Sequence, residues 1–416
     1  MEGSNRRDFL KTFSLLTGGS VLLGHVPLVN EMMAQDTKGR TVKLGMIGIG
    51  SRGKYLLEVL QMIPGHEITC FCDNYEPHFE RAQELIGPHA NGYYNYKEML
   101  EKEEIDAVVI ATPLFEHARM TIDSLDAGLH VFCEKAMGMN YQECNEMVMA
   151  QKRNNRILHI GHQRLYNVKY LKALEDIRND LLGKVTQIRA YWHRNSDWRR
   201  NVPSPELERK INWRLYLDYS RGLMTELASH QIQVANWILE EVPECVWGAG
   251  SINYWKDGRE VYDNVNLVYK YPGDTHLVYD SMTSNKKYGF EEQILGPKGT
   301  MELEMGKKYK EFPPPAPGII QLINDLEHRF FETVPIGGAS WVPENPSEDK
   351  GDYIIDKVME SDGSIMQMEA FVSNVKANKV DPWLVKEGFY ASIACLMGHE
   401  AMMNNSIVYW PDNLAL

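Results

Sequence analysis

The fold is decided near the front of the chain, by the stretch Leu44-Gly45-Met46-Ile47-Gly48-Ile49-Gly50-Ser51-Arg52-Gly53. A short apolar run leads into three glycines spaced G-x-G-x-x-G, and leucines at helical intervals follow. This order predicts a buried strand, a tight turn and a helix. Gly48 permits the turn, Gly50 lets the backbone approach a diphosphate, and Gly53 lets the helix pack on the strand. The helix N-terminus attracts the anion, so the stretch predicts a dinucleotide site. A Rossmann-like fold that binds no dinucleotide is the alternative.

An acidic residue closes the next expected strand, at 67–72. Asp73 lies about twenty positions past the last glycine, the separation typical of this fingerprint. A carboxylate there accepts hydrogen bonds from a ribose 2′-hydroxyl and repels a 2′-phosphate, so the sequence favours NAD over NADP. Ser51 and Arg52, within the glycine loop, are further candidate cofactor contacts, although Arg52 could equally cap a surface.

Strands and helices then alternate up to about residue 160. Further strands are expected at 106–111, 130–133 and 157–160, and helices at 55–63, 76–86, 117–127 and 141–152. Such alternation predicts a parallel, doubly wound sheet with helices on both faces. We assign residues 40–161 to this NAD(P)-binding Rossmann domain.

The pattern of expected secondary structure changes from about residue 184. Longer alternating strands are expected at 185–192, 248–254, 265–271 and 276–281, with helices at 223–239 and 383–403. These features predict an α+β domain with an open, mainly antiparallel sheet over 162–416, for substrate binding and oligomerisation. The last helix could pack back on the Rossmann domain. The proline-rich 312–317 is expected to be a stiff loop.

The composition separates the two halves and excludes some partners. The chain has 416 residues, 57 acidic and 44 basic, a net charge of -13 that argues against a nucleic-acid partner. Six scattered cysteines indicate neither a disulfide scaffold nor a metal site. All nine tryptophans lie at or after Trp192.

The N-terminal residues have the features of a targeting signal. Arg6 and Arg7 precede Phe9-Leu10-Lys11 and a mildly apolar stretch, 12–29, that is too weak for a stable membrane span. We predict a twin-arginine signal over 1–34 and export of the folded protein to the periplasm. A cytosolic N-terminal helix is the alternative.

Three motifs, in order, resemble the glucose-fructose oxidoreductase / inositol dehydrogenase / MocA (Gfo/Idh/MocA) family. They are Ala111-Thr112-Pro113 with His117, Val131-Phe132-Cys133-Glu134-Lys135, and Gly222-Leu223-Met224-Thr225-Glu226-Leu227-Ala228-Ser229-His230. The resemblance runs from about Val42 to the end of the chain. Three positions depart from the family pattern: Leu114 replaces a common asparagine, Ala136 the usual proline, and Glu226 the usual aspartate.

The resemblance implies NAD-dependent oxidation of a ring hydroxyl of a sugar or glycoside. It implies cofactor contacts from Thr112, Pro113, His117, Glu134 and Lys135. It places Lys135 near the reacting hydroxyl and the nicotinamide, and makes His230 a general acid or base. Glu226 lies four residues before His230, so it is expected to share a helical face and orient the imidazole.

A stretch rich in aromatic and polar residues, 191–200, suggests where a sugar could stack. The candidate substrate residues are Arg164, His193, Arg194, Trp213 and Tyr216. Ordinary packing at the edge of the second sheet is the alternative explanation.

Export in the folded state favours NAD that is tightly bound and recycled within the site. Two other functions stay open: a redox-neutral NAD-dependent glycosidase of the N-acetylgalactosaminidase type, and a non-catalytic sugar-binding protein with a vestigial cofactor site. By analogy with the family, we expect a homodimer or homotetramer.

Overall fold

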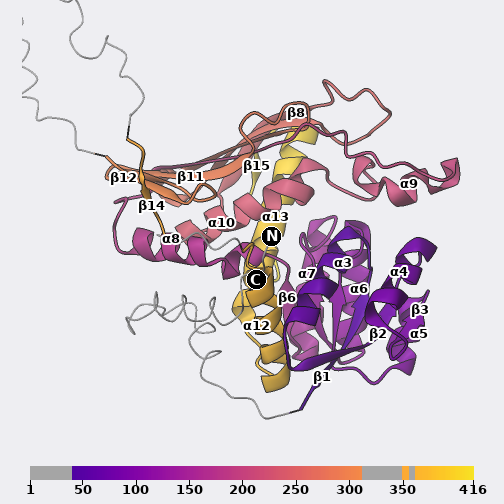
Figure 1. Ribbon diagram of the computed structural model, residues 1–416. Helices are drawn as coiled ribbons and strands as arrows, with labels where there is room; N and C mark the ends of the chain where they lie inside the picture. Colours follow the sequence, from indigo (N-terminus) through magenta and orange to yellow (C-terminus); the bar gives the residue numbers. More distant parts are fainter. Residues whose placement is uncertain (1–39, 312–348, 356–360) are drawn as a thin grey trace, which may run out of the picture.

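The computed structural model describes residues 40–311, 349–355 and 361–416. Its N-terminal unit is built on a six-stranded sheet, in which every paired strand runs parallel, with the order β3-β2-β1-β4-β5-β6 (Figure 1). The strands are β1 Val42–Ile47, β2 His66–Cys72, β3 Asn91–Tyr93, β4 Ala107–Ile110, β5 His130–Cys133 and β6 Leu158–Ile160. The predicted doubly wound architecture is confirmed. The order reverses at β1, which pairs with both β2 and β4, so a crevice for ligands opens at the C-terminal ends of these strands.

Five helices connect these strands: α3 Ser51–Met62, α4 Glu76–Ile86, α5 Tyr96–Lys102, α6 Leu114–Asp126 and α7 Tyr141–Asn154. Helix α3 begins at Ser51, directly after the glycine turn and four residues before the expected start. The short β3 and α5 were not expected, because three and seven residues are too few to show a period.

The second unit contains a nine-stranded sheet in the order β14-β13-β12-β11-β7-β10-β9-β8-β15. Its pairs are antiparallel except β7 with β10, which confirms the open, mainly antiparallel sheet. The strands are β7 Gln187–His193, β8 Cys245–Ser251, β9 Asn264–Lys270, β10 His276–Met282, β11 Phe290–Gly296, β12 Gly299–Glu302, β13 Lys307–Lys310, β14 Asp352–Tyr353 and β15 Val408–Tyr409. Strand β8 begins three residues before the expected 248–254, and the strands from β11 onward were not expected.

The helices of the second unit are α8 Val168–Arg178, α9 Glu208–Ile211, α10 Ser229–Leu239, α12 Ser364–Ala377 and α13 Pro382–Asn404. The helix expected at 223–239 is found as a π-helical turn, Met224–Ala228, continued by α10. The proline-rich segment 312–317 lies outside the described residues.

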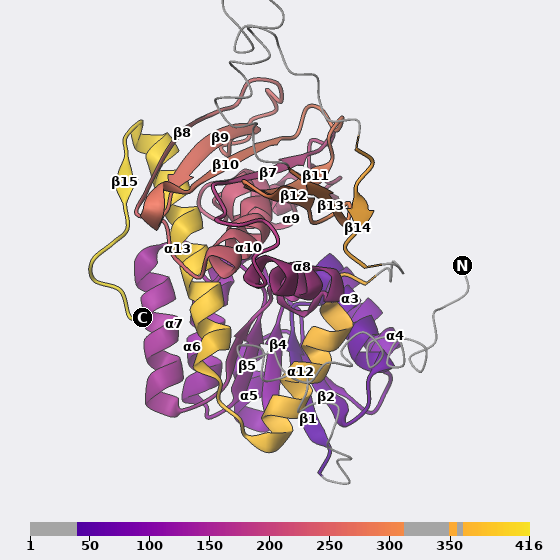
Figure 2. The ribbon, with the colours of Figure 1, turned by 90° about the vertical axis from the view of Figure 1, so that its left-hand side faces the viewer.

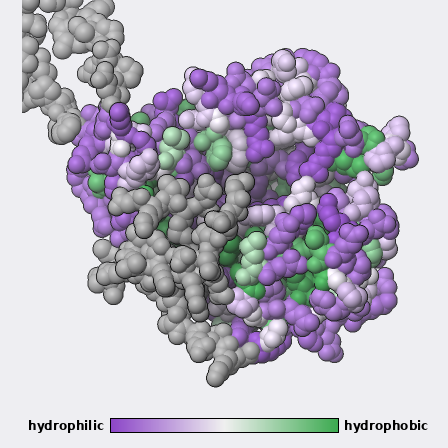
Figure 3. Space-filling view, viewed as in Figure 1, coloured by the Kyte–Doolittle hydropathy of each residue, from purple (hydrophilic) through white to green (hydrophobic). Residues whose placement is uncertain are grey.

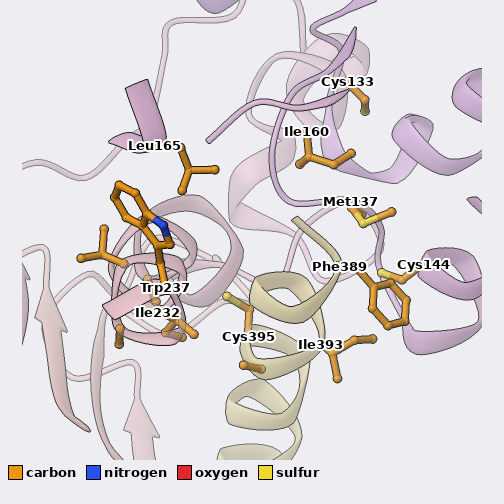
Figure 4. Packing of buried hydrophobic residues seen from close by; sticks show 14 of the residues in the cluster. Cys133, Met137, Cys144, Ile160, Leu165, Ile232, Trp237, Phe389, Ile393 and Cys395 are labelled. Carbon is orange, nitrogen blue, oxygen red and sulfur yellow. The ribbon is translucent and has the colours of Figure 1, made fainter. Parts of the chain in front are cut away.

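The last two helices join the units, as Figure 2 shows. Helix α12 packs on α3 and β1 of the Rossmann unit, whereas α13 contacts β6 and α7 at one end and α10 and β8 at the other. Figure 4 shows the α13 side chains Phe389, Ile393 and Cys395 lying between Met137 of the first unit and Trp237 of the second. One continuous core therefore fixes the crevice of the first sheet against the second sheet.

On the face shown in Figure 3, hydrophilic residues dominate both units, and hydrophobic patches between them are small. None of the helices in the described ranges has the length and apolar character needed to cross a membrane. The six cysteines are buried and free, as their scatter in the sequence suggested.

Candidate active site

The glycine loop is shaped by its own backbone. Gly48 has a φ of +86°, and a Cβ there would lie 2.8 Å from the Thr112 side chain. A Cβ on Gly53 would lie 2.0 Å from the Gly48 carbonyl oxygen, so both glycines are required by the turn itself. A Cβ on Gly50 would meet nothing closer than His78, at 3.5 Å. Gly50 thus faces open space, where a diphosphate can approach the backbone.

The surrounding residues fit a dinucleotide. The Thr112 hydroxyl, beside Gly48, is buried and has no hydrogen-bond partner within the described chain. The Asp73 carboxylate braces the loop, accepting from the Ile49 N–H at 2.7 Å and the Tyr75 N–H at 2.9 Å. Each carboxylate oxygen retains a lone pair, so Asp73 can still accept from a ribose hydroxyl.

Arg52 and Glu134, both predicted cofactor contacts, bind each other. Arg52 Nε donates to Glu134 Oε1 at 2.6 Å, and Arg52 Nη2 lies 3.5 Å from the Ser364 hydroxyl. Glu134 is 6% exposed. This ion pair connects α3 to the end of β5 and the start of α12. We therefore correct the role of both residues: they hold together the cradle, by which we mean the glycine loop 48–53 and the strand ends around it. Ser51 remains at the loop, where its hydroxyl accepts from Arg200 Nη2 at 3.2 Å.

His117 lies behind Thr112 and Pro113 rather than at the surface of the cradle. Its ring nitrogens contact the carbonyl oxygens of Ala136, at 2.7 Å, and of Thr112, at 3.0 Å. Burial opposes a charge, but the Cys133 sulfur and these carbonyls outweigh it and raise the pKa of His117 to about 9. His117 therefore joins the ends of β4 and β5, and the structure assigns it to packing.

Lys135 leaves β5 at the crevice, where the sequence places it. Its Nζ donates to the carbonyl oxygens of Glu226, at 2.7 Å, and Thr225, at 3.2 Å. Burial lowers the pKa of Lys135. The ammonium has three N–H groups, so one remains for a ligand. The peptide bond from Lys135 to Ala136 is cis.

Glu226 does not orient His230, and this expectation is corrected. Its carboxylate accepts instead from Arg214 Nε, at 2.6 Å. Glu226 lies in the π-helical turn Met224–Ala228, and its side chain is taken up by Arg214, a residue of the preceding loop. The His230 Nδ1 is buried and has no hydrogen-bond partner among the described residues. Burial, followed by the charge of Lys135, holds the pKa of His230 well below its usual range, so the imidazole is neutral.

A second neutral histidine, His162, was missed as a site residue. It is 1% exposed, both its ring nitrogens lack partners in the described structure, and burial lowers its pKa to about 3. Its ring centre lies 6.3 Å from that of His230. The available sequence signal was its position just after β6, at the same sheet edge as Lys135.

Strand β7 separates two neighbouring aromatic residues, because successive side chains point to opposite faces. Trp192 lies on the inner face, with its ring centre 5.7 Å from that of His230. His193 lies on the outer face, where its Nε2 contacts Asp280 and its ring lies 5.5 Å from Tyr191. The assignment of His193 to the substrate is therefore corrected, because Trp192, not His193, lies on the face of β7 that carries His230.

Two other predicted substrate residues are bound to carboxylates of the protein itself. Arg164 is 6% exposed and pairs with Glu292 and, at 3.3 Å, with Glu304, so its assignment to substrate is corrected to support beneath Trp192. The Tyr216 hydroxyl donates to Glu208 at 2.7 Å within the loop over 194–222, which also removes it from the site.

Trp213 and Arg194, two further predicted substrate residues, lie near Lys135 and Trp192, respectively. Trp213 packs against Leu114, Ala136 and Met139, beside Lys135. The Arg194 guanidinium lies over the Trp192 ring, 5.2 Å from its centre. Within the described ranges, no group of histidine, cysteine, aspartate and glutamate could hold a metal ion.

Two family models match the chain. One, described as an oxidoreductase family with an NAD-binding Rossmann fold, matches residues 42–162, and a GFO/IDH/MocA C-terminal domain matches residues 170–302. The chain is 26% identical over 244 residues to an alpha-N-acetylgalactosaminidase of Shewanella oneidensis, covering 53% of this chain and 52% of that protein. It is 25% identical over 262 residues to a myo-inositol 2-dehydrogenase of Thermotoga maritima, covering 62% of this chain and 74% of that protein. The match thus spans about half the length of the first relative.

Solved structures share the whole architecture. A myo-inositol 2-dehydrogenase from Lactobacillus plantarum superposes with a TM-score of 0.67 at 19% identity, covering 89% of this chain and 100% of that one. The WlbA dehydrogenase from Bordetella pertussis, in complex with NADH and UDP-GlcNAcA, superposes with a TM-score of 0.69 at 17% identity, covering 90% and 99%. At these identities the likeness establishes the fold alone.

Proposed function

Since this chain belongs to the Gfo/Idh/MocA family of NAD-binding oxidoreductases, we propose that it oxidises a ring hydroxyl of a sugar or glycoside with NAD that stays bound. The observation that carries the proposal is the environment of Lys135. Its ammonium is fixed by two main-chain carbonyls at the crevice, and two neutral imidazoles, the buried His162 and the half-buried His230, have unpartnered nitrogens near Lys135. Structural histidines are normally hydrogen-bonded when buried, so these nitrogens call for a polar ligand.

Lys135 and His230 have different roles in the proposed reaction. Lys135 donates its remaining N–H to the substrate oxygen and stabilises the negative charge that develops there. His230, neutral because it is buried, accepts the hydroxyl proton. The chemistry that NAD supplies when bound is acceptance of a hydride from the carbinol carbon. The alcohol thus becomes a ketone, one proton resides on His230, and two electrons leave with the hydride.

The loop over 194–222 supports tight retention of the cofactor. It extends from the second unit towards the Rossmann unit, with α9 on the same side as α4 in Figure 1. Arg200 reaches the Ser51 hydroxyl at the glycine turn, and Lys210 Nζ donates to the Asn74 carbonyl at 2.7 Å, beside Asp73. The loop therefore closes over both the diphosphate and the ribose end of the cradle, and Arg200 adds a cation beside the diphosphate.

Retention is tested by purifying the protein without added nucleotide and measuring the NAD released on denaturation. We expect one NAD per chain in the unaltered protein. Arg200→Gln should lose NAD on dialysis, whereas Arg189→Gln, an exposed arginine on β7, should keep it. Protein that carries no nucleotide from the start, or full retention in Arg200→Gln, would contradict this part of the proposal.

The reaction is tested by mixing NAD-loaded protein with sugars and glycosides and following reduced nicotinamide by absorbance. We expect reduction with at least one sugar class, and its loss in His230→Asn with NAD still bound. Turnover that survives in His230→Asn would contradict the assignment. A non-catalytic sugar-binding protein would instead bind sugar and leave the nucleotide oxidised.

A redox-neutral glycosidase is the second candidate, and two observations favour it. One relative is named an alpha-N-acetylgalactosaminidase, and His162 supplies a second neutral imidazole, as an elimination beside a transient ketone would need. Nitrophenyl glycosides distinguish the two reactions. Release of nitrophenol without net accumulation of reduced nicotinamide supports the glycosidase, and reduced nicotinamide without release supports the oxidoreductase.

We also propose a periplasmic location and a homo-oligomer. The proposed twin-arginine signal, 1–34, lies outside the described residues, and replacing Arg6 and Arg7 by lysine should trap the protein in the cytoplasm in a fractionation experiment. For assembly, the support is the aromatic outer face of the second sheet, with Tyr191, His193 and the exposed Tyr288. Light scattering should give the mass of a dimer or tetramer.

A further inference from the structure

Two arginines approach the same tryptophan ring but differ in charge compensation. The guanidinium carbons of Arg164 and Arg194 lie 5.6 Å and 5.2 Å from the centre of the Trp192 ring. Arg164 is buried and paired with two carboxylates, Glu292 and Glu304. Arg194 is exposed, and its guanidinium has no carboxylate partner among the described residues. Arg164 is therefore a balanced structural cation, whereas Arg194 is available to a ligand.

The side chains around Arg194 add positive charge. Burial and then the charge of Arg214 lower the pKa of Arg194, and Arg214 also acts on Lys135. Two carboxylates act on these cations: Glu226, which binds Arg214 Nε at 2.6 Å, and Glu134, which also acts on Lys135 but is paired with Arg52. Counting Arg52, four cations (Arg52, Lys135, Arg194 and Arg214) thus share two acidic partners, Glu134 and Glu226. Such an excess of positive charge attracts a negatively charged group of a ligand.

The cofactor does not account for this excess. The diphosphate belongs at the glycine loop, where Arg200 contacts Ser51 and the N-terminus of α3 lies. Arg194 belongs instead to the inner face of the second sheet, following Trp192 by two residues. The oxidised nicotinamide carries a further positive charge, which adds to the imbalance at the substrate position.

We propose that the substrate is a sugar acid whose carboxylate is bound by Arg194. A planar carboxylate matches the fork of a guanidinium, and Trp192, whose ring stacks on Phe290 at 4.7 Å, holds Arg194 on the same side of the sheet as His230. The hydroxyl to be oxidised then lies at Lys135 and His230. This inference rests on the proposed function, because it names the substrate class of the same site.

The test uses matched pairs that differ in one carboxylate: methyl glucuronide against methyl glucoside, and methyl galacturonide against methyl galactoside. Quenching of tryptophan fluorescence in NAD-loaded protein gives the dissociation constants, and absorbance gives reduced nicotinamide. We expect the acid of at least one pair to bind roughly tenfold to a hundredfold more tightly than its neutral partner, the range for hydrogen bonds to charged groups.

The variants locate this preference. Arg194→Gln should remove it, and Arg194→Lys should keep part of it, because the charge stays while the planar fork is lost. Arg189→Gln is the matched control, since Arg189 is an exposed arginine on the opposite face of β7, and it should leave the preference unchanged. Unfolding midpoints should agree among the three variants, because both side chains are exposed.

Each outcome separates the two proposals. Neutral sugars that bind as tightly as their acids, no binding by any acid, or a preference that persists in Arg194→Gln would overturn the sugar-acid inference. Acids that bind selectively through Arg194 without reducing NAD would support it while contradicting the proposed oxidation.

Discussion

The two sides of the crevice differ in whether main chain or side chains form the surface. On the Rossmann side, the cradle is mostly main chain: glycines without side chains and the helix N-terminus at Ser51. On the side of the second sheet, the surface consists of side chains, with Trp192 on β7, Arg194 directly after that strand and His230 at the start of α10. A main-chain cradle suits a cofactor shared by many enzymes, and a side-chain surface can vary with the substrate. The comparison therefore assigns NAD to the first side and specificity to the second.

The largest expected effect tests whether chemistry can be removed without removing the cofactor. Lys135→Met should lower kcat by about 10³-fold or more, since a positioned proton donor and its charge both disappear. Bound NAD should remain, because the glycine loop is untouched. Rapid mixing with substrate and nucleotide analysis after denaturation measure both quantities. Loss of NAD together with turnover would mean that Lys135 belongs to the cradle.

The next prediction separates the two arginines at Trp192. Arg164→Met leaves Glu292 buried without its cation, which should cost about 3–5 kcal/mol of the free energy of unfolding. Arg194→Gln should change this free energy by no more than about 0.5 kcal/mol, because the side chain is exposed. Urea denaturation of both variants measures the difference. Equal losses would contradict the division between a structural and a ligand-binding arginine.

An effect of intermediate size is expected in the pH dependence of the free energy of unfolding, and it tests the role of His117. His117 has a pKa of about 9 in the folded protein, above the value of roughly 6.5 expected for an unfolded chain. Its stabilising contribution is complete below about pH 6.5 and is lost as pH rises through about 9, amounting to up to about 3 kcal/mol. Unfolding free energies measured from neutral to alkaline pH should show this loss. His117→Gln should show a flatter profile, and an unchanged profile would contradict a charged His117.

The smallest effect probes the open side of the glycine loop. Gly50→Ala adds a methyl group that meets only His78, at 3.5 Å, so the unfolding midpoint should hardly move. NAD affinity should fall about tenfold, because the methyl group occupies the approach of the diphosphate. Titration of NAD into nucleotide-free protein gives this affinity. Unchanged affinity would show that the diphosphate does not approach Gly50.

The sequence predicted the first side better than the second, and for physical reasons. The glycine loop and Lys135 depend on local spacing, so Gly48, Gly53 and Lys135 lie where their motifs place them. Trp192 and His193 are adjacent in sequence, and only the register of β7 decides which of them faces the site. Glu226 was misassigned for a similar reason, because its partner, Arg214, lies in the irregular loop over 194–222, whose path the sequence does not show. Arg164 was misassigned because its partners, Glu292 and Glu304, are over a hundred residues away.

The central claim is that a carbinol hydrogen moves from a sugar to the NAD held in this crevice. The most direct test is to mix NAD-loaded protein with sugars deuterated on every ring carbon, stop the reaction and weigh the released nucleotide by mass spectrometry. We predict reduced nicotinamide that carries one deuterium, formed by the unaltered protein and not by Lys135→Met. Turnover of the sugar with no deuterium ever reaching the nucleotide would contradict the claim.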